Sequence, residues 1–67
     1  MPNYTKLRIL MVEHRLEWKD ISAIFRFSTH TISRLKNDQI VSLETLIRLC
    51  SYFNCNIGDI MDINIIN

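Results

Sequence analysis

Glycine and proline are scarce in this chain of 67 residues, which has one of each. So few turn-forming residues disfavour a sheet of many short strands and favour helices joined by short loops. The length allows one small core, with little room for a cofactor-binding fold beside a substrate pocket. We therefore expect one all-α domain over residues 1–67, with its core at about 4–62 and a short tail over 63–67.

Long hydrophobic runs are also absent, since the longest is Ile9–Val12. That run is far too short to span a membrane. The first residues do not resemble a signal peptide, because Glu13 and His14 soon interrupt the apolar stretch. These features predict a soluble, cytoplasmic protein with no membrane partner.

Reactive and metal-binding residues are few. Cys50 and Cys55 are the only cysteines, and His14 and His30 are distant in sequence from both, so no zinc site can be assembled. We expect the cysteines to be small core residues, since a reducing compartment disfavours a disulfide between them. Neither a nucleophile–base pair nor a phosphate-binding loop is evident, so we expect no enzyme activity, no cofactor and no small-molecule ligand.

Apolar residues recur with helical spacing along the chain. One face of a first helix would be formed by Tyr4, Leu7, Leu10, Met11 and His14. A second helix would open near Glu17, and Ser28 would cap a third helix over Thr29–Lys36.

The C-terminal half continues this pattern. Ser42 would cap a fourth helix and Asn54 would end it in a left-handed conformation. The inward stripe that we predict for this helix is Leu43, Leu46, Ile47 and Cys50, extended by Phe53. Asn56 would cap a last helical turn over Ile57–Met61, which makes a compact five-helix bundle in total.

The second and third segments together predict a helix-turn-helix over about residues 18–36. Ser22 is small where the two backbones would approach, and Arg26 and Phe27 form a tight connection. The polar residues expected on the outer face of the third helix are Thr29, His30, Ser33 and Arg34. All four can hydrogen-bond to base edges or phosphates.

The net charge of +1 conceals two unlike halves. Residues 19–36 hold four basic side chains against one acid, whereas residues 37–67 hold one basic side chain against four acids. A local charge of +3 over the predicted helix-turn-helix is compatible with binding to nucleic acid.

Three stretches resemble the Cro/cI-type (XRE-like) helix-turn-helix regulators, especially the short single-domain members of phages and plasmids. The stretches are residues 28–38, 41–46 and 55–61. The resemblance implies a lambda-repressor-like bundle that docks its third helix in the major groove of a double-stranded DNA operator. It also implies a small transcriptional regulator, such as a repressor, in a phage or mobile-element switch.

Individual roles follow from the same resemblance. The base-reading candidates are Thr29, His30, Ser33 and Arg34. The phosphate-contact candidates are Lys19, Lys36, Asn37, Ser42 and Thr45. Arg15 and Arg26 stand where the family often has glycine, and each would cost about 1 kcal/mol there if the left-handed conformation is kept.

An alternative function is that of an antirepressor, which would bind another helix-turn-helix repressor by protein–protein contact. Trp18 stands where the family usually places Gln, and Ile9, Val12 and Ile24 replace polar outer residues. These four side chains would form a partner surface; alternatively, the ring of Trp18 folds back and is buried.

The isoleucines of the C-terminal tail are compatible with a homodimer. Ile63, Ile65 and Ile66 would either pair as an edge strand across a two-fold axis or pack back on the first helix.

Overall fold

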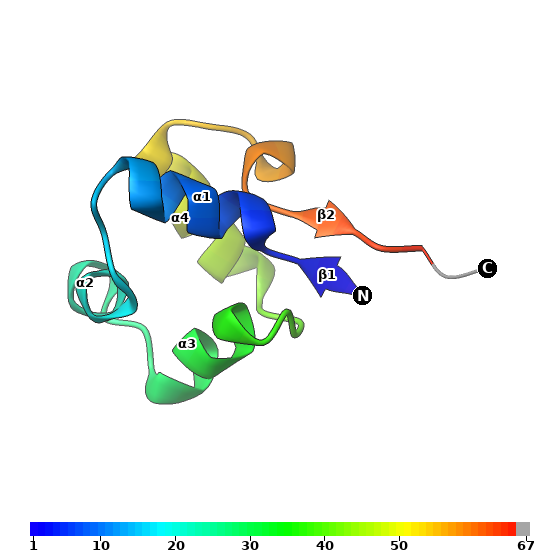
Figure 1. The fold of residues 1–67 in the computed structure, drawn as a ribbon. Coiled ribbons are helices and arrows are strands. Elements are labelled where there is room, and N and C mark those ends of the chain that lie inside the picture. Colours follow the sequence, from blue (N-terminus) through cyan, green and yellow to red (C-terminus); the bar gives the residue numbers. More distant parts are fainter. Residues whose placement is uncertain (66–67) are drawn as a thin grey trace.

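The computed structural model describes residues 1–65 and consists of short helices closed by a two-stranded ribbon (Figure 1). In chain order the elements are β1 (Pro2–Asn3), α1 (Thr5–Glu13), α2 (Trp18–Phe25), α3 (Thr29–Lys36), α4 (Leu43–Phe53), the 3₁₀ turn η1 (Ile57–Asp59) and β2 (Asp62–Ile63). The mostly helical helix-turn-helix fold is confirmed, but with four α-helices instead of five.

Polar side chains determine where the helices begin. Glu17 and Asp20 form a reciprocal capping box at the start of α2. Ser28 and Ser42 each accept a hydrogen bond of 3.2 Å from the backbone N–H three residues later, at the starts of α3 and α4. The two predicted serine caps are confirmed.

Left-handed residues determine where the chain turns after a helix. Arg15, Arg26 and Asn54 have φ values of 56°, 55° and 52°. The two arginines thus keep the left-handed conformation, which a glycine would adopt at a lower cost. The reversal at Arg26 brings α3 back against α2, and only Phe27 and Ser28 complete the connection.

The core draws on every α-helix. Ile21 and Phe25 of α2 and Ile32 and Leu35 of α3 are buried. The other buried hydrophobic residues are Tyr4, Leu7, Met11, Phe27, Leu46, Leu49 and Ile60.

The face of α4 that enters the core differs from the predicted stripe. Leu43 and Ile47 are 64% and 58% exposed, whereas Leu49 is fully buried. Apolar residues surround most of this helix, so periodicity alone could not select the inner face. The rest of the bundle selects the face that carries Leu46 and Leu49, with Phe53 packed against it.

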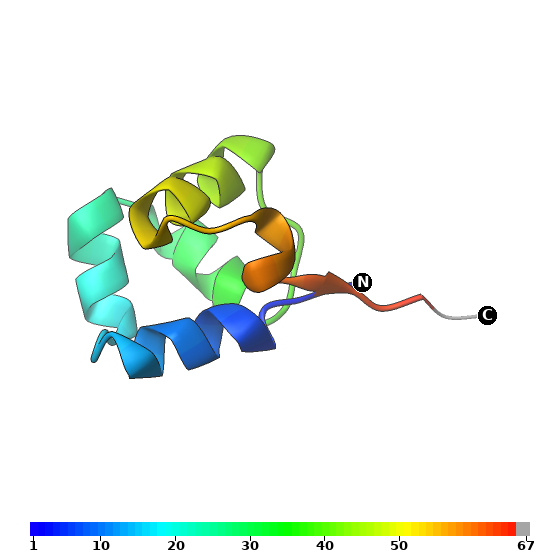
Figure 2. The same ribbon diagram turned by 90° about the horizontal axis from the view of Figure 1, so that it is seen from above.

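The C-terminal segment also differs from the prediction. Instead of a helix over Ile57–Met61, the chain forms a three-residue 3₁₀ turn and then extends into β2. Antiparallel pairing of β2 with β1 places Pro2 opposite Ile63 and Asn3 opposite Asp62. Figure 2 shows the N-terminal end of the chain beside β2. The pairing of β2 with β1 stops the 3₁₀ turn from continuing as a longer helix.

The tail therefore pairs with the chain's own N-terminus. The Asn64 N–H donates to the Met1 carbonyl at 2.8 Å, and the N-terminal ammonium donates to the Asn64 carbonyl at 3.1 Å. Ile63 and Ile65 remain exposed, and Ile66 lies outside the described residues.

Within residues 1–65, no helix has the length and apolar character needed to cross a bilayer. The longest helix, α4, has 11 residues, whereas a span needs about 20. The same part of the chain holds no group of three or more His, Cys, Asp or Glu side chains that could share a metal ion.

Candidate nucleic-acid interface

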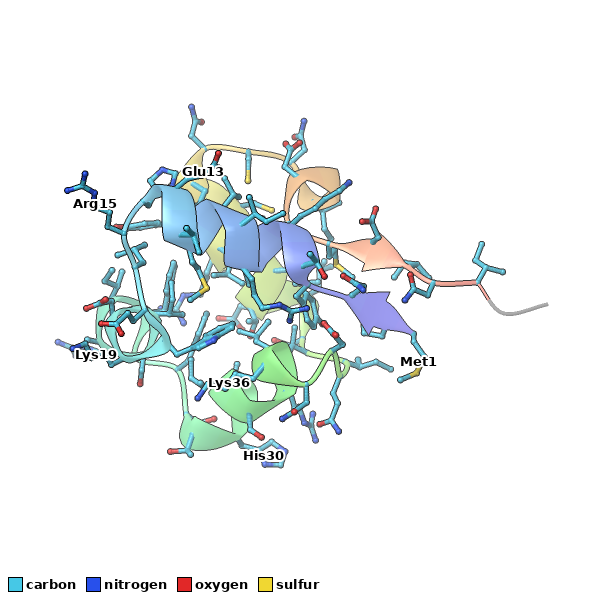
Figure 3. All side chains as sticks on the ribbon, in the orientation of Figure 1. Met1, Glu13, Arg15, Lys19, His30 and Lys36 are labelled. Atoms are coloured by element: carbon cyan, nitrogen blue, oxygen red, sulfur yellow. The ribbon has the colours of Figure 1, made fainter. Side chains whose placement is uncertain are left out.

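Helix α3 lies along one side of the bundle, with its outer face uncovered (Figure 1). Ile32 and Leu35 anchor it in the core. The four base-reading candidates, Thr29, His30, Ser33 and Arg34, are all exposed. Their spacing places them on one face of the helix, and Figure 3 shows the labelled His30 pointing away from the body of the protein.

These four side chains differ in how far they are already engaged. The Asn37 side-chain amide donates to the Ser33 carbonyl at 2.8 Å and approaches the Ser33 hydroxyl at 3.4 Å. The Arg34 guanidinium reaches the Ile40 carbonyl only at 3.5 Å, a weak contact that it can exchange for a ligand. Among residues 1–65, neither Thr29 nor His30 forms a side-chain hydrogen bond, so α3 presents at least three polar groups to solvent.

The phosphate-contact candidates divide into two sets. Lys19, Lys36, Asn37 and Ser42 are exposed. Lys19 lies 3.4 Å from Glu17, but both side chains are about three-quarters exposed, so solvent screens the pair. Thr45 is only 8% exposed and its hydroxyl lies 3.0 Å from that of Ser42, so this side chain packs beside the N-cap of α4 and offers little surface to a phosphate.

Arg48 of α4 holds the connection between α2 and α3 in place. Its guanidinium donates to the Phe25 carbonyl and lies 5.0 Å from the centroid of the Phe27 ring. Phe25 and Phe27 stack on each other, with their centroids 5.0 Å apart. A cation over an aromatic face is attracted by the ring quadrupole, so Arg48 fixes the turn that orients α3. Sequence reasoning missed this role, because a single Arg on an apolar helix gives no sign of its partner.

A polar cluster around Asp38 fixes the loop that follows α3. The Asp38 carboxylate accepts from the Tyr4 backbone N–H at 2.8 Å and from the Arg8 guanidinium at 3.1 Å. The Tyr4 hydroxyl donates to the Gln39 carbonyl at 2.8 Å. The hydrogen bond from the Tyr4 backbone, followed by that from Arg8, lowers the pKa of Asp38, and burial raises the pKa of Tyr4.

This cluster predicts a loss of stability in acid. The lowered pKa of Asp38 means that its contribution is present above the unfolded-state pKa of about 3.9 and is lost as the pH falls through the lower folded-state value. Asp38→Asn keeps a residue that tolerates the observed φ of 54° but removes the charge. We expect the variant to be less stable than wild type at pH 7 and the difference to shrink below about pH 4. Urea unfolding from pH 7 to pH 2.5 measures the difference in the free energy of unfolding between the variant and wild type. A difference that does not change with pH would contradict the role of the charge.

The four partner-surface candidates lie at the α1–α2 end and on the outer faces of these helices. Ile9, Val12 and Ile24 are exposed, and Val12 is the most open at 76%. Trp18 is half-buried and packs against the core, with Met11 and Leu16 beside it in a shallow hollow. The tryptophan thus combines both expected arrangements, because part of the side chain packs inward and part lines the surface.

Comparisons with known proteins agree with this arrangement. A sequence model of the Cro/C1-type HTH DNA-binding domain matches residues 6–64. The crystal structure of the transcriptional regulator VanUg (Form II) is similar, with a TM-score of 0.86, 30% sequence identity and coverage of 91% of this chain and 81% of that chain. No curated protein matches the sequence. With its fold, its exposed α3 and a family match over most of its length, the chain belongs to the Cro/C1-type helix-turn-helix DNA-binding domains.

Proposed function

We propose that this protein is a sequence-specific transcriptional regulator that inserts α3 into the major groove of a double-stranded operator. The exposed polar face of α3, anchored by Ile32 and Leu35 on its inner side, is the observation that carries the proposal. An α-helix fits the major groove, where each base pair presents its own pattern of donors and acceptors. The setting that we propose is a genetic switch of the phage or mobile-element type.

Each residue then has a distinct role. Arg34 forms a bidentate pair with a guanine, which is the most common specific contact. Thr29, His30 and Ser33 read neighbouring base edges. The phosphate contacts come from Lys19, Lys36, Asn37 and Ser42, which determine the position of the domain on the duplex without reading its sequence.

Binding should depend strongly on salt. Two to four neutralised phosphates per domain give a slope of about −1.8 to −3.6 in log affinity against log salt, or a loss of roughly 12- to 150-fold between 50 and 200 mM. Fluorescence anisotropy with operators selected from a random library measures this loss. Lys36→Ala should lower affinity for every sequence alike and reduce the slope by about one. Binding that is absent at low salt, or insensitive to salt, would contradict the proposed function.

We further propose that the regulator binds paired half-sites as a homodimer through an apolar surface that we call the ribbon face. It comprises Met1, Ile40, Ile57 and Ile63, all exposed. They surround adjoining hollows floored by Leu46 and Met61. Apolar surface of this kind is costly in water unless covered, and a patch beside the paired termini can meet its own copy across a two-fold axis.

Sedimentation equilibrium tests the homodimer. Wild type should shift from monomer to dimer between low and high micromolar concentration, whereas Ile40→Asp and Ile63→Asp should stay monomeric. Ile24→Asp is the matched control, because Ile24 is also exposed but lies on α2, away from the ribbon face. A wild type that stays monomeric at high micromolar concentration, or an equal effect of Ile24→Asp, would contradict this interface.

The second candidate function is that of an antirepressor, favoured by the exposed Ile9 and Val12 on α1. Such a protein would bind a helix-turn-helix repressor instead of DNA. Co-expression with the repressor of a neighbouring gene, followed by size-exclusion chromatography, separates the two functions. A stable complex that Val12→Asp abolishes would favour the antirepressor; an isolated protein that binds DNA would favour the regulator.

A further inference from the structure

The two cysteines occupy a specific pair of positions at the end of α4. Asn54 has the left-handed conformation, and both its N–H and that of Cys55 donate to the Cys50 carbonyl, the latter at 3.0 Å. The bond from the Cys55 N–H, which spans five residues around a left-handed residue, is the 6→1 hydrogen bond of the Schellman motif. A contact between the side chains at these two positions, here Cys50 and Cys55, frequently accompanies the motif.

The surroundings of the pair agree with this placement. Both thiols are free and half-buried, and both line the same surface hollow between α4 and the segment that leads to η1. Burial, followed by the neighbouring Cys50 thiol, raises the pKa of Cys55. The hollow is open to solvent, so a small molecule can reach the sulfur atoms.

We propose that Cys50 and Cys55 form a dithiol–disulfide redox site that exchanges with low-molecular-weight disulfides such as oxidised glutathione. The Cys50 thiolate attacks one glutathione sulfur, and the glutathione S–S bond breaks to release one glutathione thiolate. Cys55 then loses its proton to water and attacks the Cys50 sulfur, which forms the Cys50–Cys55 bond and releases the second glutathione thiolate. The two electrons lost by the protein thiols reduce the glutathione disulfide.

The site follows from the helix end and does not depend on DNA binding. A disulfide needs Cα atoms within about 4.4–6.8 Å and side chains directed toward each other. The hydrogen bond from the Cys55 N–H to the Cys50 carbonyl brings the two backbones together, and both side chains line one hollow, so the reduced pair starts close to this geometry. The bond would tie the last turn of α4 to the segment before η1, and the oxidised protein should unfold at a temperature roughly 5–15 °C higher.

Equilibration of the full chain with buffers of reduced and oxidised glutathione tests the proposal. At low micromolar protein, mass spectrometry should find a monomer that has lost two hydrogen atoms, with no bound glutathione. Cys50→Ser and Cys55→Ser should each give a glutathione adduct instead, and the adduct should form more slowly on Cys55 than on Cys50. The equilibrium constant for the internal disulfide should be about tenfold or more higher in native buffer than in urea.

A relocated pair separates geometry from sequence spacing. The control variant moves both cysteines by one residue, through Cys50→Ser, Cys55→Ser, Ser51→Cys and Asn56→Cys. The two new cysteines are still five residues apart, but they no longer occupy the two positions whose side chains meet in the motif. In this variant the equilibrium constant for the internal disulfide should be about the same in native buffer as in urea. Three results would overturn the proposal. They are disulfide-linked dimers, stable glutathione adducts on the wild type, and a relocated pair whose disulfide equilibrium constant exceeds its value in urea by as much as that of the wild type.

Discussion

Arg34→Ala is expected to lower the affinity for the preferred operator by about 5- to 150-fold, the cost of roughly 1–3 kcal/mol for losing a bidentate contact to one base. Arg34 is exposed on the outer face of α3, and its contact to the Ile40 carbonyl is too weak to support the fold. The variant should therefore remain folded. It should also lose its preference at one base pair, which anisotropy with operators substituted at each position measures.

Arg15→Ala is the matched control for charge. Arg15 is an exposed arginine that follows α1, on the opposite side of the bundle from the labelled His30 of α3 (Figure 3). Removing its charge should lower the affinity only slightly, with the base preference unchanged. If Arg15→Ala weakens binding as much as Arg34→Ala, the effect of Arg34 is one of net charge, and its role in reading bases would be contradicted.

Leu49→Ala is expected to lower the free energy of unfolding by about 2–5 kcal/mol. The Leu49 side chain is fully buried in the core shared by the four helices, and truncation leaves a cavity that they cannot fill completely. Since small domains are stable by only about 5–15 kcal/mol, this change should remove a large share of the stability. Urea unfolding followed by circular dichroism gives the difference.

Leu43→Ala is the control for this prediction, because it is the same substitution on the same helix at a position 64% exposed. Measured at monomeric concentrations, it should change the free energy of unfolding by roughly 0.5 kcal/mol or less. The sequence pattern predicts the opposite order, since it assigns Leu43 to the inner stripe of α4. Equal effects of the two variants would mean that the face of α4 is misassigned in the structure.

Local chemistry along the chain determined the helix-turn-helix. Ser28 and Ser42 each accept a backbone hydrogen bond at the start of the helix that follows them. Ile21 with Phe25, and Ile32 with Leu35, mark the inner faces of the two short helices. On α3 the remaining residues are polar. The outer face that carries Thr29, His30, Ser33 and Arg34 could therefore be predicted from the sequence.

Contacts between residues distant in the sequence determined the buried face of α4 and the form of the C-terminal segment. Leu43 and Leu49 are chemically identical, and only the packing of α4 against the other helices distinguishes the buried one. The short C-terminal turn follows from pairing between residues about 60 apart, and the burial of Thr45 follows from the same placement of α4. The sequence by itself determined which helix carries the exposed polar face that we propose to read DNA, because caps and periodicity act within a few residues. Only the tertiary structure decided what holds that helix in place, since Arg48 with Phe27 and Asp38 with Tyr4 are neighbours only after folding.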